Sequence, residues 1–366
     1  MTLNDISILR LRNQKIATSE LKSAKEIVSW MGAVQAQDFS MAKMALGIRV
    51  LGSTDELVEE SFNKGEILRT HLMRPTWHFI SSEDIYWMLD LTVPQIRSSM
   101  KSRNKVLELN ESILIKSNRV IEEALSEGLC LTRDELASII TRAGIRTDDN
   151  RLSHILVHAE LEGLICSGPV KMKKQTYCLL RERVPFKKVF PRDESLAELA
   201  KRYLNSHGPA TLNDFIWWSG LPVKDARQAF ESVKSGYVTE IIGSEKYLFP
   251  NSIDTLLFSK HSLYLLPSYD EFLISYKDRS ASLLFVDTKK SISDNGIFYP
   301  VIISNGKVTG TWRRSVKKGE LNIELIPFEK LNDYDINLIE KKAKRLAKFL
   351  KMELKIRYGK YHSAKT

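Results

Sequence analysis

Thr132-Arg-Asp-Glu135 and Thr211-Leu-Asn-Asp214 decide the fold, because each places a threonine three residues before an acidic residue. This spacing is typical of a capping box, in which both side chains bond to the backbone at the start of a helix. A turn signal follows each stretch, Gly144-Ile145 in the first case and Gly220-Leu221 in the second, and a second helical pattern comes next. The repeated order predicts two helix-turn-helix units of low mutual identity.

Each of these two units is completed by an earlier helix and a later pair of strands. The order is helix, helix-turn-helix, strand pair, and it describes winged-helix domains, whose second paired helix commonly enters a DNA groove. The expected segments are helices over 112–127, 149–162 and 194–206, a helix with Pro222 at its first position, and strands opening at Gly163 and Gly236.

A third, less regular copy of the unit is expected at the N-terminus. Asp38 directly precedes the helical pattern that begins at Phe39, so it is expected to be the N-cap of that helix. The strand pair of this copy is expected over 67–72 and 77–80. The expected helices are 6–14, 19–34, 39–49 and 54–63.

The last third of the chain changes from a helical to a strand-rich pattern. Asn305-Gly306, between the strand-like stretches 299–304 and 307–316, predicts a hairpin with a type I′ turn. A strand over 321–326, an amphipathic helix with apolar positions from Ile336 to Leu350 and a closing strand over 354–358 follow. The predicted fold class is α+β, with tandem winged-helix domains and a small C-terminal β-rich, barrel-like module. The predicted domains are 1–105, 106–190, 191–255 and 256–366.

Composition and short motifs exclude several classes of protein. The chain of 366 residues has no apolar run long enough to span a membrane and no basic and apolar leader, so we expect a cytoplasmic location. Cys130, Cys166 and Cys178 lack C-x-x-C spacing and are expected to be reduced structural thiols. No HExxH, paired C-x-x-C or Gly-rich phosphate loop is present, so neither a metal site nor a cofactor is expected.

The positive charge of the chain is unevenly placed. The formal net charge is +10, yet segment 170–192 alone carries +7 and segment 340–366 carries +8, which leaves −5 for the remainder. Two basic segments on a mildly acidic body indicate a surface that binds a polyanion, and simple solvation of the basic runs is the alternative.

Gln35-Ala-Gln37-Asp38 sets two neutral amides one residue apart among apolar residues. On a helix, positions i and i+2 point about 200° apart, so both amides face one cleft only where the backbone is extended or turning. The spacing therefore favours a site, while a solvated glutamine pair at a helix end is the alternative. Trp217-Trp218 invites a base-stacking interpretation, but helical spacing beside Phe215 favours a place in the core.

With these residues in view, the chain resembles the AlkZ/YcaQ family of winged-helix DNA glycosylases over most of its length. Gln35-Ala-Gln37 matches the family's Gln-aliphatic-Gln motif, and Arg69-Thr-His-Leu-Met-Arg-Pro-Thr-Trp-His78 is similar to its Met-Arg-Gly-Thr-x-His stretch, with Pro75 where the family often has glycine. The further matching stretches are His207–Gly220, Leu265–Asp270, Lys277–Arg279 and Gly310–Arg314.

The resemblance implies hydrolytic excision of alkylated purines from duplex DNA, including bulky or crosslinked bases, by a monomeric enzyme without a cofactor. It implies that Gln35 and Gln37 are catalytic. An N7-alkylated guanine is already cationic and leaves without protonation, so amides that orient water and face the developing sugar cation suffice. Gln37 is expected to hold the water and Gln35 to support it, although the reverse order stays open.

DNA contacts are expected from the matched stretches and from the first basic segment. Asp270 is expected to cap a helix or form a salt bridge, with an approach to the cleft as the alternative. The predicted DNA-binding residues are His71, Arg74, His78, Lys171, Lys173, Lys174, Arg313 and Arg314. Two other functions compete with the glycosylase: a winged-helix regulator, for which the glutamine pair is incidental, and a scaffold that binds protein.

Overall fold

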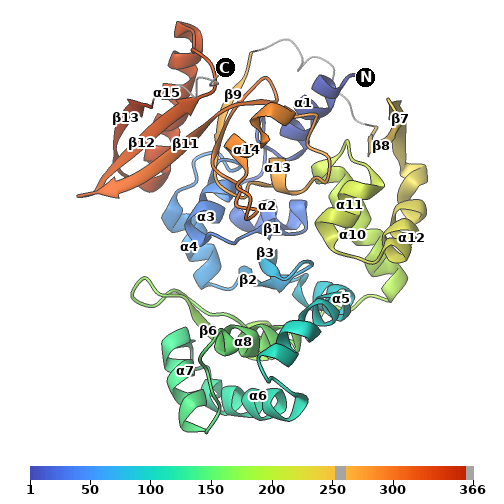
Figure 1. Ribbon diagram of the computed structural model, residues 1–366, viewed down its shortest axis with the longest axis vertical. Helices are drawn as coiled ribbons and strands as arrows, with labels where there is room; N and C mark the ends of the chain where they lie inside the picture. Colours follow the sequence, from blue (N-terminus) through green and yellow to red (C-terminus); the bar gives the residue numbers. More distant parts are fainter. Residues whose placement is uncertain (252–260, 360–366) are drawn as a thin grey trace.

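The computed structural model describes residues 1–251 and 261–359 of the chain. Three groups of short helices, each with a small antiparallel sheet, occupy the centre, the bottom and the right of Figure 1. A five-stranded sheet lies at the upper left, beside the first group. None of the helices in 1–251 and 261–359 is long and apolar enough to cross a membrane.

The first group is the N-terminal unit, and its sheet has the strand order β1-β3-β2. Asp38 caps α3 as predicted, since its side chain accepts a hydrogen bond from the backbone N–H of Met41. The predicted helices and strands are present, but α2 is shorter than the predicted helix 19–34, and Val34 instead begins the strand β1, which the sequence does not predict. The elements are α1 (Leu3–Asn13), α2 (Ala24–Met31), β1 (Val34–Gln35), α3 (Phe39–Gly47), α4 (Asp55–Asn63), β2 (Ile67–Leu72) and β3 (Thr76–Ser81).

The second group repeats this order of elements, and its sheet has the equivalent strand order β4-β6-β5. Thr132 and Glu135 form the predicted capping box at the start of α7. Cys166 and Cys178 face each other across β5 and β6, and all three cysteines are free thiols, as predicted. The elements are α6 (Glu111–Leu125), β4 (Leu131–Thr132), α7 (Arg133–Arg142), α8 (Arg151–Leu161), β5 (Ile165–Ser167), β6 (Thr176–Leu179) and α9 (Leu180–Arg183).

The third group has the same order again, with one pairing in place of the first strand. Ala210 forms an isolated bridge to Leu248, and Thr211 with Asp214 forms the predicted capping box at the start of α11. Pro222 lies at the N-cap of α12, one position before the predicted one. The elements are α10 (Arg192–His207), α11 (Leu212–Ser219), α12 (Val223–Val233), η1 (Lys234–Gly236), β7 (Tyr237–Ile242) and β8 (Glu245–Pro250).

The C-terminal sheet is open, so the expectation of a barrel-like module is wrong. Its strand order is β13-β12-β11-β10-β9, and among the described residues β9 and β13 each pair with one neighbour only. The sheet does not close because α15 carries the chain back to a parallel position beside β12, at the edge opposite β9. The elements are β9 (Leu263–Leu266), α13 (Glu271–Ile274), η3 (Phe285–Asp287), α14 (Thr288–Ser291), β10 (Val301–Ser304), β11 (Lys307–Lys317), β12 (Glu320–Pro327), α15 (Asp333–Leu350) and β13 (Glu353–Tyr358).

The predicted hairpin and the predicted basic helix are both present in this module. Asn305 and Gly306 join β10 to β11 and both have positive φ, which a type I′ turn requires. Ile339, Ala343 and Leu346 of α15 are buried against the sheet and the first unit. Residues 360–366 of the basic segment 340–366 lie outside the described residues.

The first unit lies between two hydrophobic cores, and this position determines which residues surround its strand β1. One core joins its strand β2 to α10, α11 and the helix α5 (Ile85–Val106), around Trp87 and Trp218. The other joins α2, α3 and Phe79 to the C-terminal sheet around Trp312. Trp218 is therefore a core residue, as expected, with 1% of its surface exposed. Because the first unit packs on both sides, its strand β1 is surrounded by residues distant in sequence.

Candidate active site

Gln35 is the last residue of β1, and Gln37 follows it in a bend of the backbone. Gln35 pairs with His78 across β1 and β3, and the N–H of Ala36 donates to the carbonyl oxygen of Trp77 at 2.7 Å. The backbone is a strand at Gln35 and turns at Gln37, which agrees with the extended or turning backbone that the spacing predicts. The two amides differ in burial, because Gln35 is 4% exposed whereas Gln37 is exposed to solvent.

Gln35 is held at both its side chain and its backbone. Arg74 Nη2 donates to Gln35 Oε1 at 3.0 Å, so the amide oxygen is already bound. On the open edge of β1, the backbone N–H of Gln35 donates to Glu271 Oε1 at 2.5 Å. Glu271 comes from α13 in the C-terminal module, so two distant segments fix this one glutamine.

Glu271 is a buried carboxylate that stays ionised. Its burial opposes ionisation, but His207, the hydroxyl of Ser275 and the N–H of Gln35 together lower the pKa of Glu271 to about 2. Ser275 Oγ donates to Glu271 Oε2, and His207 Nε2 lies 3.5 Å from the same oxygen. A fixed negative charge therefore lies beside the backbone N–H of Gln35.

The two histidines of the matched stretch lie inside the protein. His78 is 1% exposed, and burial followed by the positive charge of Arg74 lowers the pKa of its imidazole to about 4, so the ring is neutral near neutral pH. His71 is 9% exposed, and its Nδ1 lies 2.5 Å from Glu160 Oε2 on α8. Contact of either imidazole with DNA stays a prediction.

Arg69 ties the loop of Gln37 to the second unit. Its guanidinium donates to the carbonyl oxygens of Ala36 at 2.9 Å and Gln37 at 3.4 Å, and to Gln175 Oε1 at 2.5 Å. It also lies over the ring of Trp77, 4.1 Å from the centroid. Burial lowers the pKa of Arg69 to about 10, which still leaves it cationic. The backbone around Gln37 is thus positioned while its side chain is left exposed.

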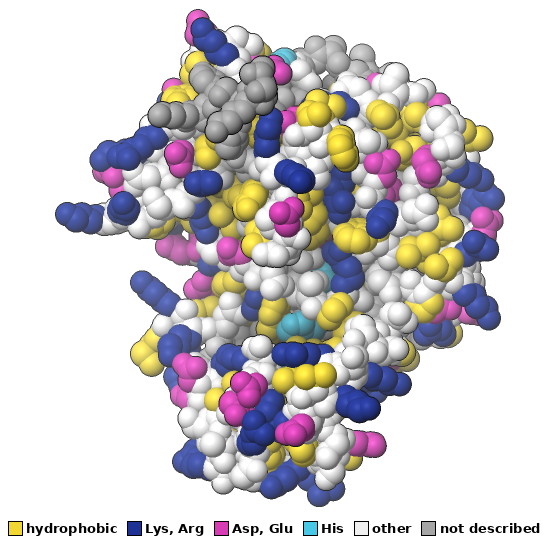
Figure 2. All heavy atoms as spheres, in the orientation of Figure 1, with side chains coloured by type: hydrophobic (Ala, Val, Ile, Leu, Met, Phe, Trp, Pro, Cys, Tyr) yellow, Lys and Arg dark blue, Asp and Glu magenta, His cyan; other side chains and the backbone are white. Residues whose placement is uncertain are grey.

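The predicted lysine contacts, together with Arg313 and Arg314, lie on the β5–β6 and β11–β12 hairpins, which extend to the left in Figure 1. Lys171, Lys173 and Lys174 are exposed in the turn between β5 and β6. Arg313 is exposed on β11, whereas Arg314 is half-buried and donates to Ser40 Oγ at 2.6 Å, close to Gln37 in the chain. Figure 2 shows a notch between the two hairpins, with dark blue side chains on either side.

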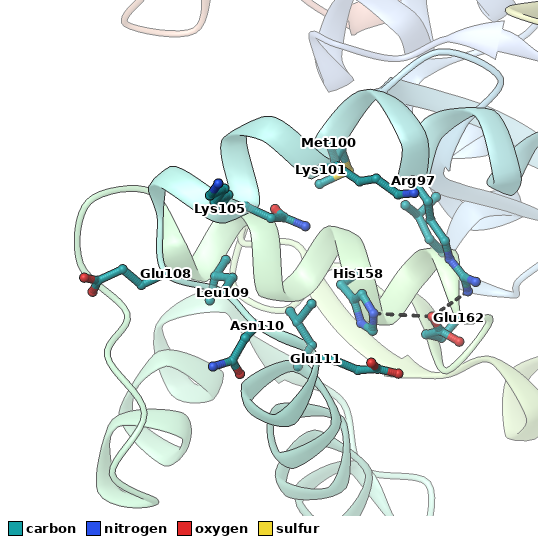
Figure 3. A pocket seen from close by; sticks show the side chains of 13 residues that line it. Arg97, Met100, Lys101, Lys105, Glu108, Leu109, Asn110, Glu111, His158 and Glu162 are labelled. Carbon is teal, nitrogen blue, oxygen red and sulfur yellow. Dashed lines mark hydrogen bonds and ion pairs between the residues drawn. The ribbon is translucent and has the colours of Figure 1, made fainter.

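A cavity of about 680 Å³ lies away from the glutamines, between α5, α6 and α8. Its walls include Met100, Leu109 and Leu161, and Glu162 at its edge accepts from Arg97 and lies 3.3 Å from His158 (Figure 3). These charged groups neutralise one another, so the cavity offers less for glycosidic chemistry than the amides of β1 do. Within 1–251 and 261–359, no group of three or more His, Cys, Asp or Glu side chains is placed to hold a metal ion.

Several residues that complete this site are not among those that the sequence predicts. Glu271 directly follows the matched stretch that ends at Asp270, and Asp270 itself caps α13 and forms a salt bridge with Arg49, as expected. Glu160 is fully buried on α8, and no signal in the sequence distinguishes it from the neighbouring Glu162. Arg69 lies within a matched stretch and could have been found from its charge between buried strand positions.

Comparison with known proteins places this chain in a family. The family described as DNA glycosylase AlkZ-like matches residues 28–349, so the chain belongs to it. The curated interstrand DNA cross-link repair glycosylase of Streptomyces sahachiroi is 23% identical over 361 residues, which cover 93% of this chain and 94% of that protein. The solved structure of Streptomyces sahachiroi DNA glycosylase AlkZ has the same fold, with a TM-score of 0.80, 21% identity and coverage of 98% of this chain and 100% of that one.

Proposed function

We propose that this protein is a monofunctional DNA glycosylase that hydrolyses the N-glycosidic bond of alkylated purines in duplex DNA, with N7-alkylpurines as its first substrates. The observation that carries the proposal is the exposed amide of Gln37, two residues beyond Gln35, whose amide oxygen and backbone N–H are both bound, in a chain of the AlkZ-like DNA glycosylase family. The reaction consumes water and needs neither a metal nor a cofactor.

The two glutamines take different roles in this proposal. Gln35 Oε1 already accepts from Arg74, so Gln35 supports the site and its amide N–H groups are left for the network. No residue in 1–251 or 261–359 forms a side-chain hydrogen bond with the Gln37 amide, so its oxygen orients the attacking water and faces the developing sugar cation. The ionised Glu271, bonded to the backbone N–H of Gln35, adds a fixed negative charge nearby.

The protonation states around the glutamines favour leaving groups that are already cationic. His78, the imidazole nearest in strand register, is neutral near neutral pH because its pKa is about 4, and Glu271 is ionised because its pKa is about 2. Neither group can protonate a departing base at neutral pH. N7-alkylguanine leaves without protonation, whereas hypoxanthine and other neutral bases should be poor substrates.

Duplex DNA is expected to lie in the notch of Figure 2, between the β5–β6 and β11–β12 hairpins. The three units support this, because a helix, a first strand or bridge, two helices and a strand pair are the parts of winged-helix domains. We propose their boundaries as 1–105, 106–190 and 191–255, with 256–366 as the C-terminal module; the boundary near 255 lies outside the described residues. A monomer and a cytoplasmic location complete the proposal.

The proposed function is tested by incubating the protein with duplex DNA that contains one N7-methylguanine, followed by alkali to cleave abasic sites. Strand cleavage in several sequence contexts is expected, and a neutral hypoxanthine duplex serves as the control substrate. A protein that binds one sequence and releases no base would contradict the proposal and favour a regulator. Because the curated relative is named for cross-link repair, a duplex with an N7-linked interstrand crosslink is the next substrate to test.

A further inference from the structure

Three cationic side chains surround the indole ring of Trp217. Arg74 lies 5.4 Å from the ring centroid, Lys277 lies 5.1 Å away and Arg279 lies 5.3 Å away. The ring itself is fixed, because Trp217 Nε1 donates to the carbonyl oxygen of Ile274 at 2.7 Å. Arg74 comes from the turn between β2 and β3, Trp217 from α11, and the other two cations from the segment after α13. The fold thus brings three segments together at one ring.

The nearby carboxylates are engaged elsewhere. Asp214 forms a salt bridge with Arg10 and accepts from the backbone N–H groups of Lys277 and Asp278. Asp278 accepts from Ser280, and Glu271 accepts from Gln35 and Ser275. Within the described ranges, none of the three cations forms an ion pair. Like charges gathered without a counter-ion are unfavourable unless an anion joins them.

Unused donors remain on these cations. Arg74 Nη2 is bound to Gln35, but its Nε is buried and has no partner among the described residues. Arg279 uses Nε for the carbonyl oxygen of Leu273 and Nη1 for that of Lys277, and its Nη2 has no such bond. Lys277 is exposed and carries three donors. Burial, followed by the charge of Arg74, lowers the pKa of Arg279 to about 10, so this guanidinium remains cationic near neutral pH.

The positive charge of this cluster determines which part of the DNA it binds. A cationic N7-alkylpurine is repelled by three positive charges, so the damaged base does not stack on Trp217. The backbone phosphate is the anion that accompanies a nucleotide whose sugar lies against Gln35 and Gln37, and Arg74 contacts Gln35 directly. Arginine and lysine together are the usual phosphate ligands in DNA-binding proteins.

We propose that Arg74, Lys277 and Arg279, arranged around Trp217, bind the backbone phosphate adjacent to the damaged nucleotide. The proposal rests on the proposed glycosylase function, because it takes the DNA backbone as the ligand. In this arrangement the phosphate lies at Trp217 and the damaged base does not. The same contact holds the abasic product, since the phosphate is unchanged by excision of the base.

The experiment measures binding to a duplex with an uncleavable tetrahydrofuran abasic analogue, in which single phosphates near the analogue are replaced by methylphosphonates. In the wild type, one flanking methylphosphonate is expected to weaken binding roughly tenfold, as removal of one charge-assisted hydrogen bond does. Lys277→Ala and Arg279→Gln should each weaken binding to the unmodified duplex and lower the salt slope by about 0.9. That same methylphosphonate should then have little further effect on them.

Lys289→Ala is the matched control, because it removes an exposed lysine of the same module that does not face Trp217. In this variant the methylphosphonate should still weaken binding tenfold. If every methylphosphonate affects Arg279→Gln and Lys277→Ala as strongly as wild type, the phosphate site is refuted. The assay requires no base excision, so it can fail while N7-methylguanine is excised, and it can succeed when no excision occurs.

Discussion

The first and second units share one topology, yet only the first carries a site. In the second unit β4 ends at Thr132, and the same residue caps the next helix through a capping box that satisfies the local backbone. In the first unit β1 ends at Gln35 and the cap comes only at Asp38. The two residues between them, Ala36 and Gln37, form a short non-helical segment that bends at Gln37 and leaves this residue exposed. A small change at one strand-to-helix junction is therefore enough to present a functional group.

The strand edges of the two units differ in the same way. The N–H of Gln35 on the edge of β1 bonds to the buried carboxylate of Glu271, which the C-terminal module supplies. The backbone N–H of Thr132, at the equivalent junction, bonds to Glu135 within its own capping box. The first junction therefore depends on distant residues, whereas the second is complete by itself.

The strongest test of this contrast is Gln37→Ala. Removal of one preorganised electrostatic group lowers catalysis by roughly 10²–10³, so single-turnover excision of N7-methylguanine should fall by that factor. Gln35→Ala should have a smaller effect, and DNA affinity should barely change in either variant. Equal excision rates for wild type and Gln37→Ala would move the chemistry to another residue.

The second test measures the stability of the protein at acid pH, because His78 and Glu271, on either side of Gln35, both have lowered pKa values. His78 has a pKa of about 4 against an ordinary 6.5, so its contribution to stability is complete above pH 6.5 and is lost as the pH falls to 4. Glu271 has a pKa of about 2 against 4.5, so its contribution is complete above pH 4.5 and is lost as the pH falls further. Each contribution is about 3 kcal/mol.

Urea unfolding at a series of pH values measures both effects. His78→Gln should flatten the decline in unfolding free energy between pH 6.5 and 4, and Glu271→Gln should flatten it below pH 4.5. His154→Gln is the comparison, since burial also lowers the pKa of this half-buried imidazole of the second unit, and it should flatten the decline less than His78→Gln does. Unchanged curves in the first two variants would show that these groups are not ionised as described.

The third test compares the two helix caps. Asp38→Ala removes the acceptor for the N–H of Met41, and Thr132→Ala removes the acceptor for the N–H of Glu135. Each should cost about 1 kcal/mol of unfolding free energy in urea titrations. Only Asp38→Ala should also slow excision, since it loosens the segment of Gln37. A similar loss of excision in Thr132→Ala would remove the distinction between the junctions.

The smallest effect, on DNA affinity, is expected at the turn between β5 and β6 of the second unit. The turn of the second unit is exposed, but Lys171 and Lys174 lie near Glu135 and Asp134, at 3.7 Å and 2.9 Å. Replacement of Lys171, Lys173 and Lys174 by Ala should reduce the log–log salt slope of DNA binding by about 0.9 for each phosphate that these lysines neutralise. Lys101→Ala, on α5, is the control. An unchanged slope in the triple variant would exclude this turn from the DNA interface.

Local signals in the sequence predict most elements of the fold. Both capping boxes, the Asp38 cap and the Asn305-Gly306 turn are governed by residues within a few positions, so they can be read directly. The sequence signals predict no element at α5, because it contains Pro94 in its interior, a residue that helix patterns rarely carry. The open C-terminal sheet depends on where β13 returns, and this is a matter of tertiary packing.

The site can be predicted less completely than the fold, for a physical reason. The glutamine pair stands out because its spacing excludes a shared helix face, but nothing near Gln35 indicates that Glu271 bonds to its backbone. The sequence leaves two interpretations of His71 and His78 equally open, an exposed DNA contact and a buried structural histidine, and only the packing of β2 and β3 between two cores shows that they are buried. Partners distant in sequence leave no local periodicity to detect.

The bond from Gln35 to Glu271 joins residues that are 236 positions apart, which has a consequence for synthesis of the chain. Protein chains emerge from the ribosome N-terminus first, so the complete glutamine motif is outside long before the carboxylate that fixes it. A nascent or truncated chain therefore carries the motif on a strand whose edge is still free. The bond that fixes Gln35 therefore forms only after residue 271 has been made, long after the glutamine motif has emerged.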